Sequence, residues 1–133
     1  MDTMQTPVQQ KILIVDDKPR NLLALQKVLV DLDATIIEAT NGNDALRASL
    51  HHDFSLAILD VQMPEMDGYE LAELLLGDGK EGRLPIIFLT AAMKDEQDVF
   101  AGYDLGAIDY IVKPYEPRVL LSKVRTFREL DRH

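Results

Sequence analysis

The chain has 133 residues, of which 47% are hydrophobic, so it is long enough for one globular domain and too short for an added effector domain. Its formal net charge of -9 argues against direct nucleic-acid binding, which needs clustered Lys and Arg to neutralise phosphates. The absence of cysteine excludes a disulfide framework and a thiolate metal site, and no apolar stretch is long enough to cross a membrane.

The beginning of the chain differs in character from the rest. Residues 1–10 are polar and include Pro7, so we expect a flexible lead-in before one ordered domain over 11–133. These residues lack the basic and apolar segments of a secretory signal. We therefore expect a cytoplasmic protein.

Apolar runs and helical periodicities alternate along the ordered part. Short apolar and β-branched runs predict strands, and apolar residues at spacings of three and four predict helices. In chain order, the predicted elements are strand 12–15, helix 19–31, strand 35–39, helix 45–49, strand 55–60, helix 67–75, strand 85–90, helix 95–106, strand 109–113 and helix 117–130.

Strict alternation of strands and helices predicts a parallel sheet, because parallel neighbours need crossover connections and these are right-handed. The fold class is therefore α/β, a doubly wound five-stranded parallel sheet with helices on both faces. Of the two common strand orders, the flavodoxin-like order 2-1-3-4-5 places the first and third strands at the switch point, where ligands bind.

Acidic residues end both of these strands. Asp16 and Asp17 follow the first strand, and Asp60 ends the third. Carboxylates gathered at one crevice repel one another, so a proton or a cation must relieve them. Because the ligands are all oxygen atoms, the sequence favours Mg²⁺, or Mn²⁺, over zinc.

Two further polar residues end the neighbouring strands. Thr90 offers a hydroxyl group after the fourth strand, and Lys113 offers an ammonium group after the fifth. A phosphoryl group between metal, hydroxyl and ammonium would have its charge stabilised, and one carboxylate could attack it to form an acyl phosphate. Taken singly, each residue is more simply a helix cap, a strand end or a solvated lysine; their convergence on one crevice favours the site.

The segment Leu59-Asp60-Val61-Gln62-Met63-Pro64-Glu65-Met66-Asp67-Gly68 resembles the phosphoacceptor segment of response-regulator receiver domains, and the resemblance extends over residues 11–130. It implies that Asp60 accepts the phosphoryl group. It also implies that Asp16 and Asp17 hold Mg²⁺ with Asp60 and the backbone carbonyl of Gln62.

Three further roles follow from the same resemblance. Thr90 matches the hydroxyl of the conformational switch, Tyr110 the aromatic residue that moves with it, and Lys113 the phosphate-binding lysine. Lys113-Pro114 resembles the Lys-Pro pair of this family, and the peptide bond of that pair is usually cis.

The resemblance implies a signalling module that takes its phosphoryl group from a histidine kinase or a histidine phosphotransfer protein. Such a module catalyses its own phosphorylation and dephosphorylation and turns over no external substrate. Its output surface would be the face of the fourth helix, fifth strand and fifth helix, which would contact an effector domain or partner protein, or form a phosphorylation-dependent dimer. The last helix has no evident stop signal, so we expect it either to fray or to continue into a linker.

Two other functions remain open on the sequence. A phosphatase of haloacid-dehalogenase type also uses an aspartyl nucleophile. The pattern of that family after the first strand is Asp-x-Asp-x-Thr, whereas this chain has Asp16-Asp17-Lys18-Pro19, so its second aspartate is misplaced. A flavodoxin-like cofactor binder needs a phosphate loop at that position, and the adjacent aspartates would repel the phosphate.

Overall fold

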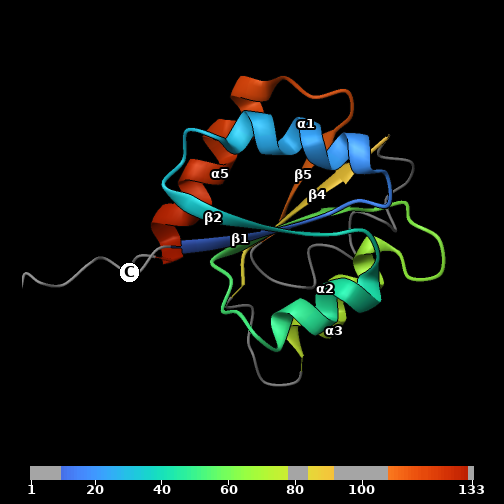
Figure 1. Cartoon of the computed structure of the whole chain (residues 1–133). Helices are drawn as coiled ribbons and strands as arrows, with labels where there is room; N and C mark the ends of the chain where they lie inside the picture. The colour runs from blue at the N-terminus through green and yellow to red at the C-terminus, as the bar shows by residue number, and fades with distance from the viewer. Residues whose placement is uncertain (1–9, 78–83, 92–107, 132–133) are drawn as a thin grey trace, which may run out of the picture.

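The computed structural model describes residues 10–77, 84–91 and 108–131, which form one parallel sheet with helices on both faces (Figure 1). The five strands follow the order β2-β1-β3-β4-β5, which confirms the predicted doubly wound fold. The strands are β1 (Gln10–Val15), β2 (Ala34–Ala39), β3 (Leu56–Asp60), β4 (Ile86–Thr90) and β5 (Ile108–Val112). The described helices are α1 (Pro19–Leu29), α2 (Gly42–Ser49), α3 (Gly68–Leu76) and α5 (Pro117–Asp131).

The alternation of side chains along the strands divides the core into two apolar layers. Ile12 and Ile14 of β1 face a layer that α1 and α5 cover, whereas Leu13 and Val15 face the layer beneath α2 and α3. Figure 1 shows the two helix pairs on opposite faces of the sheet. Because β1 is buried on both faces, it reads in the sequence as a continuous apolar run.

The strand register brings the two acidic strand ends together. Val15 of β1 lies opposite Leu59 of β3, so the residues that follow them, Asp16 and Asp60, are neighbours at the carboxyl edge of the sheet. The crevice predicted from the strand order is therefore where the aspartates meet.

Two helices begin at side-chain caps. Asp67 and Glu70 form a capping box at the start of α3, in which each side chain accepts a hydrogen bond from the other residue's backbone N–H. Asn41 accepts from the backbone N–H of Asp44 at 2.7 Å, so α2 begins at Gly42, three residues before the predicted start at Ala45.

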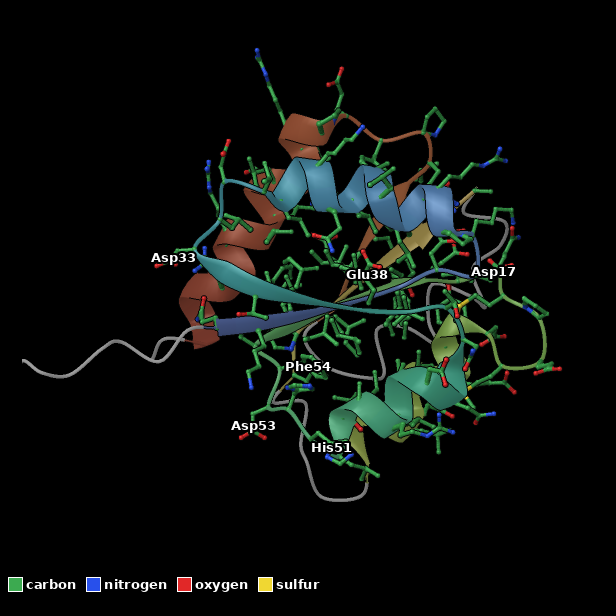
Figure 2. All side chains as sticks on the ribbon, viewed as in Figure 1. Asp17, Asp33, Glu38, His51, Asp53 and Phe54 are labelled. Carbon is green, nitrogen blue, oxygen red and sulfur yellow. The ribbon has the colours of Figure 1, made fainter. Side chains whose placement is uncertain are left out.

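The end of α5 is tied to the opposite edge of the sheet. Arg128 donates from Nε to Oε1 of Gln10 at 2.6 Å and from Nη2 to the backbone oxygen of Asp33 at 3.1 Å. Asp33, labelled in Figure 2, precedes β2. These bonds join α5 to the starts of two neighbouring strands.

The other differences from the sequence prediction are small. β1 begins at Gln10, two residues before the predicted strand and inside the predicted lead-in, and α1 ends at Leu29 rather than near Asp31. Residues 1–9 and the helix predicted over 95–106 lie outside the described residues. No helix in the described part of the chain is long and apolar enough to cross a membrane.

Candidate functional site

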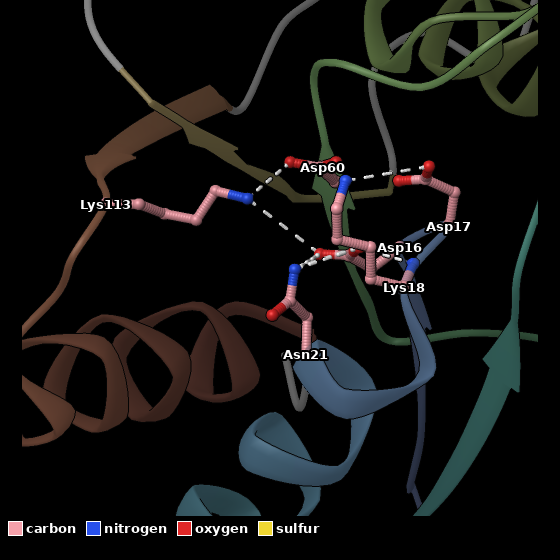
Figure 3. A network of polar contacts seen from close by, with 6 residues as sticks. All are labelled: Asp16, Asp17, Lys18, Asn21, Asp60 and Lys113. Carbon is pink, nitrogen blue, oxygen red and sulfur yellow. Dashed lines mark hydrogen bonds and ion pairs between the residues drawn. The ribbon is translucent and has the colours of Figure 1, made fainter.

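Three carboxylates meet at the carboxyl edge of the sheet, where the sequence predicts a metal site (Figure 3). Asp16, Asp17 and Asp60 each place an oxygen within 4.8 Å of the others. Asp16 is 1% exposed and Asp60 is 3% exposed, whereas Asp17 lies partly open at the rim. Because like charges this close destabilise one another, the cluster favours a bound cation or proton.

Lys113 supplies a positive charge beside two of these carboxylates. Its Nζ lies 2.9 Å from Oδ1 of Asp60 and 3.9 Å from Oδ2 of Asp16. The backbone N–H of Lys113 donates to the backbone oxygen of Thr90 at 2.7 Å, which extends the pairing of β4 with β5. Lys18 lies beside Asp17, and even these two ammonium groups against three ionised carboxylates leave the site with a net negative charge.

Asp16 is held in place by hydrogen-bond donors. Nδ2 of Asn21 lies 3.2 Å from both carboxylate oxygens, and the backbone N–H of Lys18 donates to Oδ1 at 2.9 Å. Asn21 is not among the site residues predicted from the sequence, because an asparagine in the first turn of a helix is ordinarily a surface residue. The only indication of its role in the sequence is its position two residues after Pro19, which places it in the first turn of α1, near the end of β1.

Asp17 has one oxygen that the described residues leave unpaired. Oδ1 is buried without a hydrogen-bond partner among them, while Oδ2 lies 3.9 Å from Nζ of Lys18. A buried carboxylate oxygen without a partner costs free energy. The all-oxygen cluster and this unpaired atom together fit a hard divalent cation.

The electrostatics of the site act on Asp60. Burial raises the pKa of Asp60 above its ordinary value of 3.8, and repulsion by Asp16 and then Asp17 raises it further. The hydrogen bond and charge of Lys113 oppose this rise. The Asp60 carboxylate is consequently a more basic oxygen nucleophile than a solvated aspartate, and Lys113 favours its ionised form.

The remaining predicted residues lie around this cluster. Thr90 is buried at the end of β4. Gln62 follows Asp60 by two residues in the loop before α3, with its side chain exposed. Tyr110 is half-buried on β5, with its ring centroid 5.5 Å from that of Phe88 and 6.4 Å from that of Tyr69. The structure thus brings the carboxylates together with Lys113, and places Tyr110 in an aromatic cluster.

The start of α3 packs directly on the backbone after Asp60. A Cβ atom at Gly68 would lie 2.5 Å from the backbone oxygen of Asp60 and 2.9 Å from Cα of Val61, so only glycine fits. The N–H of Gly68 donates to the oxygen of Val61 at 2.9 Å. This close approach fixes the loop that carries Gln62, and the sequence alone did not reveal it.

A cavity of about 460 Å³ opens beside the carboxylates, between α1 and the residues that follow β5. Leu25 and Leu89 give it an apolar lining, with Asp16 and Lys113 among its polar residues. Tyr115 also lines it, and burial, followed by the charge of Asp16, raises the pKa of the tyrosine. The Lys113–Pro114 peptide bond is cis, as the resemblance implies.

Comparison with known proteins identifies the family. The model of the response regulator receiver domain matches residues 12–125. The chain belongs to this receiver-domain family. It is thus a receiver domain of the two-component class, and the match does not support the haloacid-dehalogenase-type phosphatase.

Curated relatives of this receiver domain include two named as regulators of transcription. The probable transcriptional regulator ycf27 of Cyanidium caldarium is 38% identical over 126 residues, which cover 95% of this chain and 49% of that protein. The transcriptional regulatory protein PcoR of Escherichia coli is 39% identical over 118 residues, which cover 88% of this chain and 50% of that protein. The chain spans about half the length of these relatives.

Solved structures share the fold of this receiver domain. The chemotaxis protein CheY4 of Vibrio cholerae has a TM-score of 0.81 at 28% identity, covering 90% of this chain and 99% of that one. The signal receiver domain of a signal transduction histidine kinase from Syntrophus aciditrophicus has a TM-score of 0.79 at 36% identity, covering 90% of each chain.

Proposed function

We propose that Asp60 of this receiver domain accepts a phosphoryl group from a phosphohistidine of a histidine kinase or histidine phosphotransfer protein. The observation that carries the proposal is a buried carboxylate 2.9 Å from an ammonium group and beside two further carboxylates. An Asp60 oxygen would form a bond to phosphorus as the phosphorus–nitrogen bond breaks. The imidazole of the donor would keep the electron pair of that bond and take up a proton.

The neighbouring residues have separate roles in this proposal. Lys113 would donate to an oxygen of the transferred group and balance its charge. Asp16, Asp17, Asp60 and the backbone carbonyl of Gln62 would hold Mg²⁺ or Mn²⁺. When bound, the ion supplies positive charge beside the transferring phosphoryl group. Asn21 would keep the Asp16 carboxylate in its present orientation.

The output of the domain is part of the same proposal. Phosphorylation of Asp60 would draw the hydroxyl of Thr90 toward the site and allow Tyr110 to move inward, which shifts the balance between two surface arrangements. The face formed by β5, α5 and the helix expected over 95–106 would bind an effector domain or partner, or form a phosphorylation-dependent dimer. Two relatives are named transcriptional regulators, which supports an effector that acts on transcription.

We also place the domain in the cytoplasm. The support is biochemical, since histidine kinases draw their phosphoryl groups from ATP. A receiver in the same compartment can accept them directly.

Phosphoryl labelling tests the proposed function directly. Incubation with Mg²⁺ and acetyl phosphate should add one phosphoryl group, visible by intact mass. Hydroxylamine should remove this group, because an acyl phosphate is a mixed anhydride whose carbonyl carbon hydroxylamine attacks, releasing phosphate. Reduction of the labelled protein, followed by peptide mapping, should place the modification at Asp60. Label at any other residue of the intact protein would contradict the assignment.

Magnesium binding gives an independent test of the carboxylate cluster. An ion that binds only the folded state at ten times its Kd should add about 1.4 kcal/mol to the free energy of unfolding. For a chain of this length that corresponds to a rise in Tm of about 5 °C. Asp17→Ala should remove most of this rise, because it deletes the unpaired oxygen as well as a negative charge.

Asp53 provides a matched control for this measurement. It is an exposed aspartate before β3, labelled in Figure 2 well away from Asp17. Asp53→Ala should keep the full Mg²⁺ response. A response that survives in both Asp16→Ala and Asp17→Ala would rule out these residues as the ion's ligands.

A further inference from the structure

Three aromatic rings from three elements pack together on the α3 side of the sheet. The centroid of Tyr69 in α3 lies 4.7 Å from that of Phe88 in β4, and Phe88 lies 5.5 Å from Tyr110 in β5. The two tyrosines are 6.4 Å apart, so all three pairs fall within the range of attractive ring contacts. Phe88 is fully buried, whereas both tyrosines are half-buried.

Two of the three rings, those of Phe88 and Tyr69, belong to elements whose backbone is fixed by neighbouring strands or by close packing. Phe88 lies within β4, which pairs with β3 on one side and β5 on the other. Tyr69 follows Gly68, whose backbone lies against the Asp60 carbonyl and donates to Val61. Its backbone position is therefore fixed relative to the proposed phosphoacceptor.

Tyr110 is placed differently. It lies on β5, which is an edge strand of the sheet, and its strand partner is Phe88. The side chains of Thr90, Phe88 and Tyr110 project from the same face, because Thr90 and Phe88 are two residues apart on β4 and Tyr110 is in register with Phe88. A Tyr110 ring that moves inward along this face is bounded by Phe88 and Tyr69.

We propose that Tyr69 is a positioning residue of the switch, whose ring forms the wall that Tyr110 packs against in its inward position. This inference rests on the proposed function of Asp60. The half-buried Tyr110 ring of this structure already lies 6.4 Å from the Tyr69 ring, and we take this packed arrangement as the inward one that the Tyr69 ring stabilises. Linkage then requires that the Tyr69 ring also strengthens binding at Asp60 of any group that favours that arrangement.

Beryllofluoride, a phosphate mimic that binds beside the acceptor carboxylate, is the probe for this inference. Its apparent affinity is measured in the whole chain at saturating Mg²⁺ by titration followed through backbone amide signals near Asp60. Tyr69→Leu should weaken this affinity about three- to tenfold, the factor expected for the loss of one aromatic pair. Tyr69→Phe keeps the ring, so its affinity should lie closer to that of the wild type than to that of Tyr69→Leu.

A double-mutant cycle shows whether the effect passes through Tyr110. In a Tyr110→Leu background, Tyr69→Leu should leave the beryllofluoride affinity unchanged. Phe54→Leu is the matched control, since Phe54 is another half-buried aromatic residue against the same core layer, and its ring packs on His52 at 5.8 Å. This variant should bind beryllofluoride with wild-type affinity.

The outcomes separate the inference from the function on which it rests. Equal weakening by Tyr69→Leu in both backgrounds would overturn the inference, because Tyr69 would then act through the loop after Asp60 alone. Unchanged or tighter binding of beryllofluoride by Tyr69→Leu would overturn the inference as well. If Tyr69→Leu fails to fold, Tyr69→Met replaces it in these measurements. A wild-type protein that binds no beryllofluoride would instead refute the proposed function of Asp60.

Discussion

The Asp60→Asn variant should take up no phosphoryl group from acetyl phosphate and yet be more stable than the wild type at pH 7 in the absence of Mg²⁺. The loss of uptake follows because an amide has no nucleophilic carboxylate oxygen. The gain in stability follows because burial and the charges of Asp16 and Asp17 both disfavour ionised Asp60 in the folded state. A neutral side chain of nearly the same shape removes that repulsion and can still accept from Lys113. We expect the free energy of unfolding to rise by about 1 kcal/mol.

The same pKa predicts how this gain depends on pH. Because the pKa of Asp60 is raised in the folded protein above 3.8, the unfolded chain releases this proton at a lower pH than the folded chain does. The wild type therefore loses stability as pH rises from about 3.8 through the folded pKa, and the penalty stays constant above it. The advantage of Asp60→Asn should be small near pH 4 and reach its full size near neutrality.

Chemical unfolding at a series of pH values measures both quantities. Asp53→Asn is the control, since Asp53 is exposed and outside the cluster, and it should show no such pH-dependent gain. An Asp60→Asn protein that is less stable than the wild type at pH 7 would show that Lys113 outweighs burial and repulsion in this site.

Much of the fold can be predicted from the sequence because the central strands are buried on both faces. Residues 12–15 and 56–59 are continuous apolar runs, each followed by an aspartate. The polar residue marks the strand end, and the alternation of strands with helices limits the topology to a few orders. The convergence of Asp16, Asp60 and Lys113 follows from these strand ends.

The contacts that complete the site depend on close packing between elements, which spacing does not encode. Asn21 reaches Asp16 only because of the angle at which α1 leaves β1. The approach of Gly68 to the Asp60 backbone requires knowing that α3 begins directly against that strand. The ring contacts of Tyr69 likewise depend on which side chains meet across α3, β4 and β5. In the sequence these residues look like an ordinary helix turn, a loop glycine and a helix tyrosine.

Replacing Lys113 by methionine should change two properties of the site in opposite directions. The rate of phosphoryl uptake from acetyl phosphate should fall about a hundredfold, the scale for loss of one donor to a developing charge. Binding of Mg²⁺ should become tighter by roughly tenfold, because the ammonium competes with the ion for Asp60 and Asp16. The two measurements are uptake kinetics at saturating Mg²⁺ and a Mg²⁺ titration of Tm.

Lys123→Met is the matched control for this pair of measurements. Nζ of Lys123 lies 2.7 Å from Oδ2 of Asp109, so the variant also removes an ammonium from an aspartate, but one outside the carboxylate cluster. Both uptake and Mg²⁺ affinity should stay near the wild-type values. If Lys113→Met slowed uptake and weakened Mg²⁺ binding together, the lysine would be holding the carboxylates in their ion-binding geometry. Opposite changes would show that its charge acts on the phosphoryl group itself, at a cost in affinity for the ion.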